Sequence, residues 1–179
     1  MKKNLLLISL LVLMSSCNNN QKIEKENLNS TIFVCSDLHL LSKNLISEDN
    51  QIYRKEIFTS DGRVQELDYD LLESFINEVN NKKPDAVCIT GDLTFNGEKD
   101  SHLEVSKLLS TINEDIKVLV VPGNHDTFHL GSSSYINDKK ENVANITKDE
   151  FKEIYNDFGY SNAISYDNDS LSYFYKIND

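Results

Sequence analysis

Residues 116–126 read Ile-Lys-Val-Leu-Val-Val-Pro-Gly-Asn-His-Asp and join an apolar run directly to a cluster of polar side chains. The run 116–121 is short and rich in β-branched residues, which predicts a buried strand. Pro122-Gly123 follows as a turn signal and ends the strand. The cluster Asn124-His125-Asp126 is therefore expected at the carboxyl end of a strand.

The same arrangement occurs twice earlier in the chain. Residues 31–36 (TIFVCS) run into Asp37-Leu38-His39, and residues 86–90 (AVCIT) run into Gly91-Asp92. All three runs are apolar throughout and do not alternate, a pattern that predicts strands covered on both faces. Each predicted strand thus ends in residues of types that bind metals.

Amphipathic helices are expected between these strands, at residues 67–79 and 98–113. In the second helix we assign the inner face to the apolar residues Leu103, Leu108, Leu109 and Ile112. The order strand–helix–strand–helix–strand predicts an α/β fold with a parallel sheet and right-handed crossovers.

The remaining segments carry weaker local signals. Residues 147–158 predict a helix with a capping box at Thr147-x-x-Glu150 and a C-terminal stop at Gly159. The polar stretch 37–66 is expected to be a long loop that shapes a substrate site. A hairpin around Asn168-Asp169 is expected from two late runs, residues 163–166 and 171–177.

The three polar clusters are expected to meet at one place, because ligands bind beyond the carboxyl ends of parallel strands. In Asp37-x-His39, a turning backbone lets a carboxylate and an imidazole face one point. Gly91 is expected to leave room for the Asp92 carboxylate, and Gly123 to adopt a positive φ. Carboxylate, imidazole and amide donors suit Mn, Fe or Zn.

Each cluster alone also has an ordinary interpretation. Asp-x-His tripeptides are mostly surface polar residues, and Gly-Asp and Gly-Asn-His-Asp also occur as plain turns. Their order along the chain, each at a predicted strand end, favours one common site over three unrelated turns.

Three motifs carry a family resemblance: Asp-Leu-His at 37–39, GDLTFNGE at 91–98 and PGNHD at 122–126. Together they resemble the first three sequence blocks of the calcineurin-like metallophosphoesterases, over residues 31–126. The resemblance implies a sandwich of two mixed β-sheets flanked by helices. It also implies two divalent metal ions, and hydrolysis of a phosphomonoester or phosphodiester substrate by metal-activated water.

The resemblance also implies a role for each matching residue. Metal binding falls to four of them: Asp37 and His39 for the first metal, Asp92 as the bridge between both metals, and Asn124 for the second. His125 would lie near the leaving-group oxygen as a proton donor or charge stabiliser. Asp126 would orient the imidazole of His125.

The family's later Gly-His and Gly-His-x-His blocks, which supply three more histidine ligands, have no counterpart here. The histidines of this chain are His39, His102, His125 and His129. We expect a fold that is incomplete at its C-terminus and negligible activity for these residues alone. The alternative is a non-catalytic surface lipoprotein that keeps the fold as a binding module. His102 is expected on a helix surface, and His129 in a solvated loop, with contact to substrate as the alternative.

The first residues predict export and lipid attachment. Lys2-Lys3 precede an apolar run at 5–14, which is too short to cross a bilayer but typical of a signal peptide. Met14-Ser15-Ser16-Cys17 resembles a bacterial lipobox, and an ordinary secretory signal is the alternative. The chain then divides into a signal peptide (1–16), a polar tether (17–30) and a domain (31–179). A lipid on Cys17 would hold the domain at the cell membrane, facing outside the cytoplasm.

The composition limits the partners of the 179-residue chain. Its 29 acidic side chains outnumber the 18 basic ones and give a formal charge of −11. This balance disfavours a nucleic-acid-binding surface, which needs a basic face. Cys35 and Cys88 lie in apolar runs and are expected as free thiols, with a disulfide between them as the alternative in an exported protein.

Overall fold

The computed structural model describes residues 29–47, 50–59, 65–167 and 169–178. The predicted signal peptide, the predicted lipidation site at Cys17 and most of the predicted tether lie outside these residues. Among the helices of the described part, none is long and apolar enough to cross a membrane.

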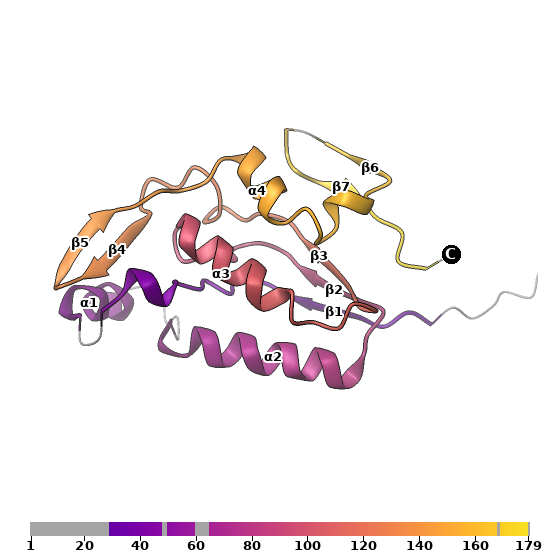
Figure 1. Ribbon diagram of the computed structural model, residues 1–179, viewed down its shortest axis with the longest axis horizontal. Helices are drawn as coiled ribbons and strands as arrows, with labels where there is room; N and C mark the ends of the chain where they lie inside the picture. The colour runs from indigo at the N-terminus through magenta and orange to yellow at the C-terminus, as the bar shows by residue number, and fades with distance from the viewer. Residues whose placement is uncertain (1–28, 48–49, 60–64, 168, 179) are drawn as a thin grey trace, which may run out of the picture.

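Three parallel strands form the centre of the molecule in the order β1 (Ile32–Cys35), β2 (Ala86–Ile89) and β3 (Lys117–Val120) (Figure 1). Cys88 of β2 pairs with Val34 on one side and Leu119 on the other. The first pair is connected through α2 (Asp68–Lys82) and the second through α3 (Lys99–Leu109). The predicted α/β order and the parallel pairing are confirmed.

The two connecting helices lie on the same side of the sheet (Figure 1), as right-handed crossovers that progress in one direction require. Along β1, Phe33 and Cys35 pack against the core, whereas Ile32 is 44% and Val34 is 65% exposed. The expectation of strands covered on both faces is therefore wrong for β1. An apolar run shows that a strand is hydrophobic, but not how many layers cover it.

The main core lies between the sheet and the helices. Its fully buried members come from β2, β3, α2, α3 and the segment around α4 (Lys148–Ile154): Val79, Val87, Val105, Val120, Ile146, Phe151 and Tyr155. Cys35 and Cys88 are both free thiols, as expected.

The helices differ from the predictions mainly at their ends. α2 continues to Lys82 and ends where Lys83 adopts a left-handed conformation (φ 51°) directly before Pro84. In α4 the predicted capping box of Thr147 and Glu150 is confirmed, but the helix stops at Ile154. Turns follow up to Gly159, whose φ of 114° precedes the short helix η3 (Tyr160–Asn162).

The stretch predicted as a long loop, residues 37–66, contains regular structure. It holds η1 (Lys43–Leu45), α1 (Gln51–Thr59) and the start of η2 (Gln65–Leu67). The side chain of Asn50 accepts a hydrogen bond from the Tyr53 backbone N–H (2.9 Å) at the start of α1. Tyr53 then packs into a second, smaller core with four other buried side chains: Leu41, Leu45, Phe95 and Tyr135. These tertiary contacts, which the polar sequence does not reveal, hold the segment.

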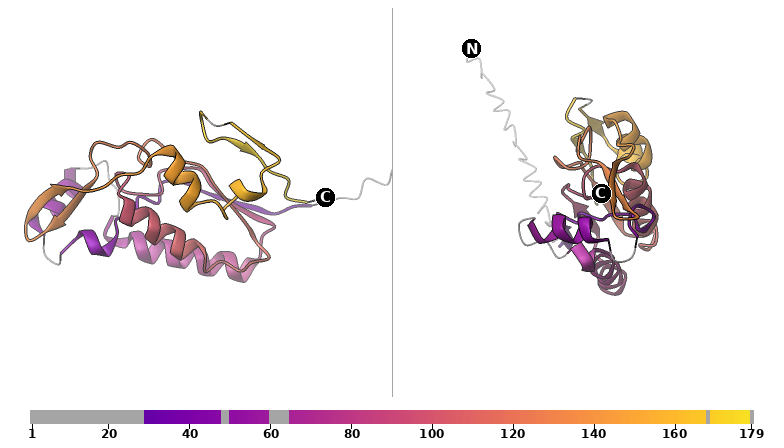
Figure 2. Two further views of the ribbon diagram at one scale, coloured as in Figure 1. Left: turned by 45° about the horizontal axis from the view of Figure 1, so that its top comes forward. Right: turned by 90° about the vertical axis from the view of Figure 1, so that its left-hand side faces the viewer.

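Two antiparallel hairpins complete the described part. The predicted late hairpin is confirmed in a shorter form, as β6 (Ser165–Tyr166) and β7 (Tyr173–Phe174). The other, β4 (Ser133–Ile136) with β5 (Lys139–Asn142), lies beside α1 at one end of the molecule (Figure 2). The described residues thus form one three-stranded and two two-stranded sheets, without the large second sheet of the expected sandwich.

Candidate metal centre

The three polar clusters do meet at the carboxyl edge of the sheet, as predicted. The backbone N–H of Asp37 donates to the Gly91 carbonyl (3.1 Å), and that of His39 to the Asp92 carbonyl (2.9 Å). The backbone N–H of His125 donates to Oδ1 of Asp92 (2.9 Å). Segments that are far apart in the sequence are therefore joined by direct hydrogen bonds around Asp92.

A group with the character of a metal site forms at this junction. One ligand atom from each of His39, Asp92 and His125 lies within 4.8 Å of the others. Nε2 of His39 is 3.6 Å from Oδ1 of Asp37 and 3.9 Å from Oδ2 of Asp92. The His39 and His125 rings meet edge to face at 4.9 Å. Imidazole nitrogens beside carboxylate oxygens fit a borderline divalent ion.

Three residues of this site have a strained backbone. Asp37, His39 and Asp92 have φ values of 59°, 46° and 51°, in the left-handed region that residues other than glycine rarely adopt. Such outliers persist only where the surrounding structure holds them, and they concentrate at functional sites. The strain therefore supports a functional role for this edge of the sheet.

The two glycines of the site have exchanged the roles predicted for them. Gly91 takes the positive φ (105°), and a Cβ on Gly123 would lie 2.2 Å from Oδ1 of Asp92. Gly123 thus provides the space for the Asp92 carboxylate that was expected from Gly91. The sequence shows two glycines at strand ends, but only the backbone path shows which one needs the conformation and which the space.

Asp126 has partners other than the predicted one. Its carboxylate is fully buried and accepts hydrogen bonds from the backbone N–H groups of Gly123 (2.8 Å), Leu93 (3.2 Å) and Thr94 (3.0 Å). It also accepts from the hydroxyl of Thr94 (3.0 Å). Asp126 therefore joins the turn after β3 to the turn after β2, and its role in orienting His125 stays a prediction.

The imidazole of His125 is oriented by a backbone carbonyl. Its Nδ1 lies 2.8 Å from the Phe95 carbonyl oxygen and 3.1 Å from Oδ1 of Asn96. Since a carbonyl only accepts, Nδ1 carries the proton in the neutral ring and Nε2 carries the lone pair. Asn124, between Gly123 and His125, has an exposed side chain, and its role as a ligand stays a prediction.

His102 is buried, so its prediction as a surface residue is wrong. Its Nε2 lies 2.8 Å from the Asp126 carbonyl oxygen, and its Nδ1 lies 3.0 Å from the Tyr155 hydroxyl. Burial lowers the pKa of this histidine. The inner face of α3 runs through His102, Val105 and Leu109, while Leu103 is 50% exposed. Of the four residues assigned to the inner face, Leu109 and Ile112 are buried and Leu108 packs against the core, so the assignment by apolarity was wrong for Leu103 and omitted His102.

The turn that orients His125 is supported by Glu98, which the sequence did not single out. Oε2 of Glu98 accepts a hydrogen bond from the Asn96 backbone N–H (3.0 Å). The side chain is fully buried, and burial raises its pKa to about 7. The only signal in the sequence was the position of this acid at the end of the GDLTFNGE block, at residues 91–98.

His129 lies against the site instead of in solvent. Its ring stacks on that of His125, with centroids 5.1 Å apart and planes 16° from parallel. Burial and the neighbouring His125 lower the pKa of His129, while the Asp92 carboxylate acts in the opposite direction.

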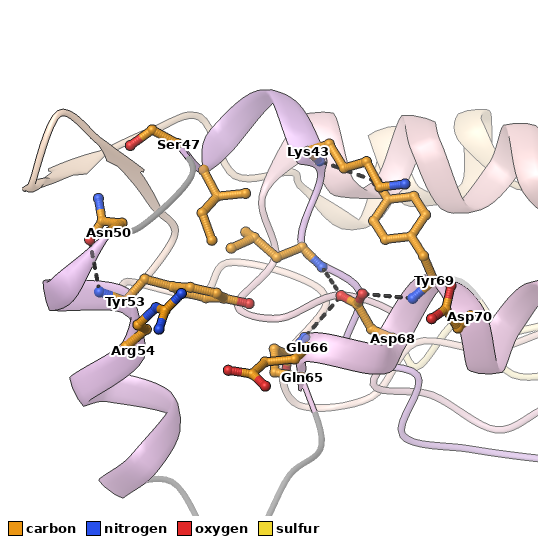
Figure 3. Close-up of a pocket in the computed structure, with 12 residues that line it drawn as sticks. Lys43, Ser47, Asn50, Tyr53, Arg54, Gln65, Glu66, Asp68, Tyr69 and Asp70 are labelled. Carbon is orange, nitrogen blue, oxygen red and sulfur yellow. Dashed lines mark hydrogen bonds between the residues drawn. The ribbon is translucent and has the colours of Figure 1, made fainter.

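A cavity of about 760 Å³ opens between α1 and the start of α2 (Figure 3). Most of its lining comes from the stretch that was expected to shape a substrate site, including Tyr53, Arg54 and Glu66. Gln65 also lines it and donates from Nε2 to the carbonyl of His39. The cavity is therefore directly connected to the backbone that carries a predicted metal ligand.

The parallel sheet with histidine and aspartate side chains gathered at its carboxyl edge defines an α/β protein with a group of side chains that could hold a metal ion. The chain belongs to the calcineurin-like phosphoesterase family, whose model matches residues 30–177. Members of this family are phosphoester hydrolases that typically bind two metal ions, and the group of His39, Asp92 and His125 fits such a centre.

One curated relative covers a limited part of the chain. It is a probable cyclic nucleotide phosphodiesterase of Ruthia magnifica subsp. Calyptogena magnifica, and it is 42% identical over 55 residues. The match covers 31% of this chain and 23% of that protein. The chain thus spans about a quarter of the length of the curated relative that it matches.

Proposed function

We propose that this chain carries the metal-binding part of a phosphoester hydrolase that uses two divalent ions, drawn from Mn, Fe and Zn. The observation that carries the proposal is the group of His39, Asp92 and His125, whose ligand atoms lie within 4.8 Å of one another at the strand ends. The substrate is a phosphomonoester or a phosphodiester. The name of the curated relative adds cyclic nucleotides as the first diesters to test.

Each residue of the site is assigned one role in the proposed reaction. Asp37 and His39 would hold the first ion, Asp92 would bridge both, and Asn124 would hold the second. Two such ions, when bound, supply a nucleophilic water at neutral pH and neutralise phosphoryl charge. His125 keeps its Nδ1 proton on the Phe95 carbonyl, so it would donate to the leaving-group oxygen a second proton that Nε2 has taken up beforehand.

The ligands gathered by the described residues are few for two ions. Within the parts of the chain that the structure describes, the assigned ligands are Asp37, His39, Asp92 and Asn124, since His125 of the group is assigned to proton transfer. We therefore expect the 179-residue chain alone to bind metal weakly and to hydrolyse phosphoesters negligibly. The same shortage favours the second candidate function, a non-catalytic binding module that keeps the fold.

Metal titration tests the proposal directly. The chain should bind Mn²⁺ in isothermal titration calorimetry, and Asp92→Asn should weaken binding at least about tenfold, because a bridging ligand is lost. Asp100→Asn is the matched control, since Asp100 is exposed in the first turn of α3. Equal affinities for these two variants would refute the site.

Hydrolysis assays separate the two candidate functions. Bis(p-nitrophenyl) phosphate, p-nitrophenyl phosphate and a cyclic nucleotide distinguish diester from monoester activity. The longest natural product of the gene that contains this chain is assayed beside the 179-residue chain. Metal-dependent turnover by the longer product alone supports the hydrolase, and Mn²⁺ binding without turnover by either supports the binding module.

We also propose a lipid anchor at Cys17, on the sequence motif alone. Cells grown with a labelled fatty acid should label the wild-type protein but not Cys17→Ala. The labelled protein should enter the detergent phase of a Triton X-114 partition. Cleavage without labelling would favour the ordinary secretory signal.

A further inference from the structure

The loop that follows the third ligand cluster shows an inverted pattern of burial. Phe128 is 57% exposed and Leu130 is 94% exposed, whereas the polar ring of His129 between them is turned inward. The hydrophobic effect alone would select the opposite arrangement. Phe128 also has a φ of 54°, a strained value for an aromatic residue. Exposed apolar side chains and a strained backbone occur together here, beside the candidate metal centre. This combination indicates that the loop conformation serves to place His129.

Several contacts hold His129 in this position. The carbonyl of His129 accepts hydrogen bonds from the Ser132 hydroxyl (3.0 Å) and from Nδ2 of Asn145 (3.0 Å). A Cβ on Gly131 would lie 2.8 Å from Cε1 of the His129 ring, so only glycine leaves room for the ring there. The ring is therefore fixed from its backbone and from one edge.

The hydrogen bonding also defines the tautomer of His129. The backbone N–H of Gly131 donates to Nδ1 of the ring (3.0 Å). Since Nδ1 accepts, the proton of the neutral ring is on Nε2. The stack with His125 is nearly parallel (16°), so the two rings lie one above the other and not in line. His129 thus offers an N–H donor at a fixed position, on the ring that stacks against His125, the proposed proton donor.

We propose that His129 is a substrate-contacting residue of this site, and that its Nε2–H donates a hydrogen bond to a phosphoryl oxygen of the bound phosphoester. This inference rests on the proposed function, and it adds to the metal ligands a hydrogen-bond donor whose orientation is fixed by the Gly131 backbone N–H. No bond to His129 forms or breaks: the ring supplies a hydrogen bond to an oxyanion, while His125 exchanges the proton. A positioned N–H donor stabilises phosphoryl charge where that charge develops.

Orthophosphate binding to the Mn²⁺-loaded 179-residue chain tests the inference. His129→Phe keeps a flat ring for the stack and removes the donor, whereas His129→Gln keeps an N–H group at similar reach. Leu130→Ala is the matched control, because Leu130 is a neighbour in the loop and is 94% exposed. Mn²⁺ affinity is measured by electron paramagnetic resonance and phosphate affinity by calorimetry, with circular dichroism to verify folding.

His129→Phe should keep Mn²⁺ affinity within about twofold and lose about tenfold or more in phosphate affinity, as expected for one hydrogen bond to a charged group. His129→Gln should retain most of the phosphate affinity, and it carries the test if the Phe variant misfolds. Unchanged phosphate binding by His129→Phe, or by a folded His129→Gln and His129→Ala alike, would overturn the inference and leave the metal site intact. Absence of Mn²⁺ binding by the parent would overturn the proposed function, and this inference with it.

Discussion

Two neighbouring regions of the site are built in opposite ways. The Asp126 clamp consists of five residues: Thr94, His102, Gly123, Asp126 and Tyr155. Its carboxylate is fully buried and accepts four hydrogen bonds. The ligand rim consists of Asp37, His39, Asp92 and His125, and it combines positive φ values with an Asp37 side chain that is 64% exposed.

The difference separates two tasks. The clamp satisfies its polar groups internally, as buried groups must, and so fixes the turns after β2 and β3. The rim holds acidic and imidazole groups close together on a strained backbone, and such strain is found where function requires it. Substitutions in the clamp should therefore reduce stability, and substitutions in the rim should reduce metal affinity.

The largest effect is expected for Asp126→Ala. It would leave three backbone N–H groups and the Thr94 hydroxyl buried without their acceptor, which should destabilise the fold by about 3–5 kcal/mol. Denaturant unfolding measures this, with the exposed Asp100→Ala as a control that stays within about 0.5 kcal/mol. A loss below about 1 kcal/mol for Asp126→Ala would contradict the buried clamp.

The buried carboxyl of Glu98, next to the clamp and the rim, should make the free energy of unfolding depend on pH. Burial raises its pKa from 4.5 to about 7, so between these values the folded state binds more protons than the unfolded state. Its contribution to stability is present below about pH 4.5 and is lost as the pH rises through about 7, by up to about 3 kcal/mol. Glu98→Gln removes the titrating group, so this variant should gain on the parent between pH 5 and 8. Parallel stability curves for parent and variant would show that Glu98 is not buried as described.

Tyr155→Phe probes the far end of the clamp. It removes the hydroxyl 3.0 Å from Nδ1 of His102 and leaves this nitrogen buried without that partner. The expected loss is about 1–2 kcal/mol in the free energy of unfolding. Tyr166→Phe, at a tyrosine that is 51% exposed, should change it by less than about 0.5 kcal/mol. Equal losses of unfolding free energy for both variants would contradict the contribution of the Tyr155–His102 hydrogen bond to the clamp.

The smallest effect on stability is expected at the rim. Asp37→Asn should change the free energy of unfolding by less than about 0.5 kcal/mol, because the side chain is 64% exposed. The same variant should weaken Mn²⁺ binding about 10- to 100-fold, because it removes a ligand charge. Calorimetry and unfolding on one preparation measure both. A large loss of stability with unchanged metal affinity would reverse the distinction between rim and clamp.

Some of the misassigned features had no local signal. Residues 51–59 are mostly polar, and they form α1 because Tyr53 enters an aromatic core with Phe95 and Tyr135. His102 looks like a surface residue in an amphipathic pattern, and it is buried because Asp126 and Tyr155 satisfy both ring nitrogens. Periodicity reports apolar residues, so polar residues that are buried with partners escape it.

The sequence by itself determined the order of strands and helices, the parallel sheet and the three clusters at its carboxyl edge. Short apolar runs and turn signals act locally, so they can be read along the chain. Only the tertiary structure decided that Gly123 and not Gly91 makes room for Asp92, that the Phe95 carbonyl lies against Nδ1 of His125, and that His129 turns inward. Those outcomes depend on which backbone atoms from distant segments come within a few ångströms, and no local pattern encodes that distance.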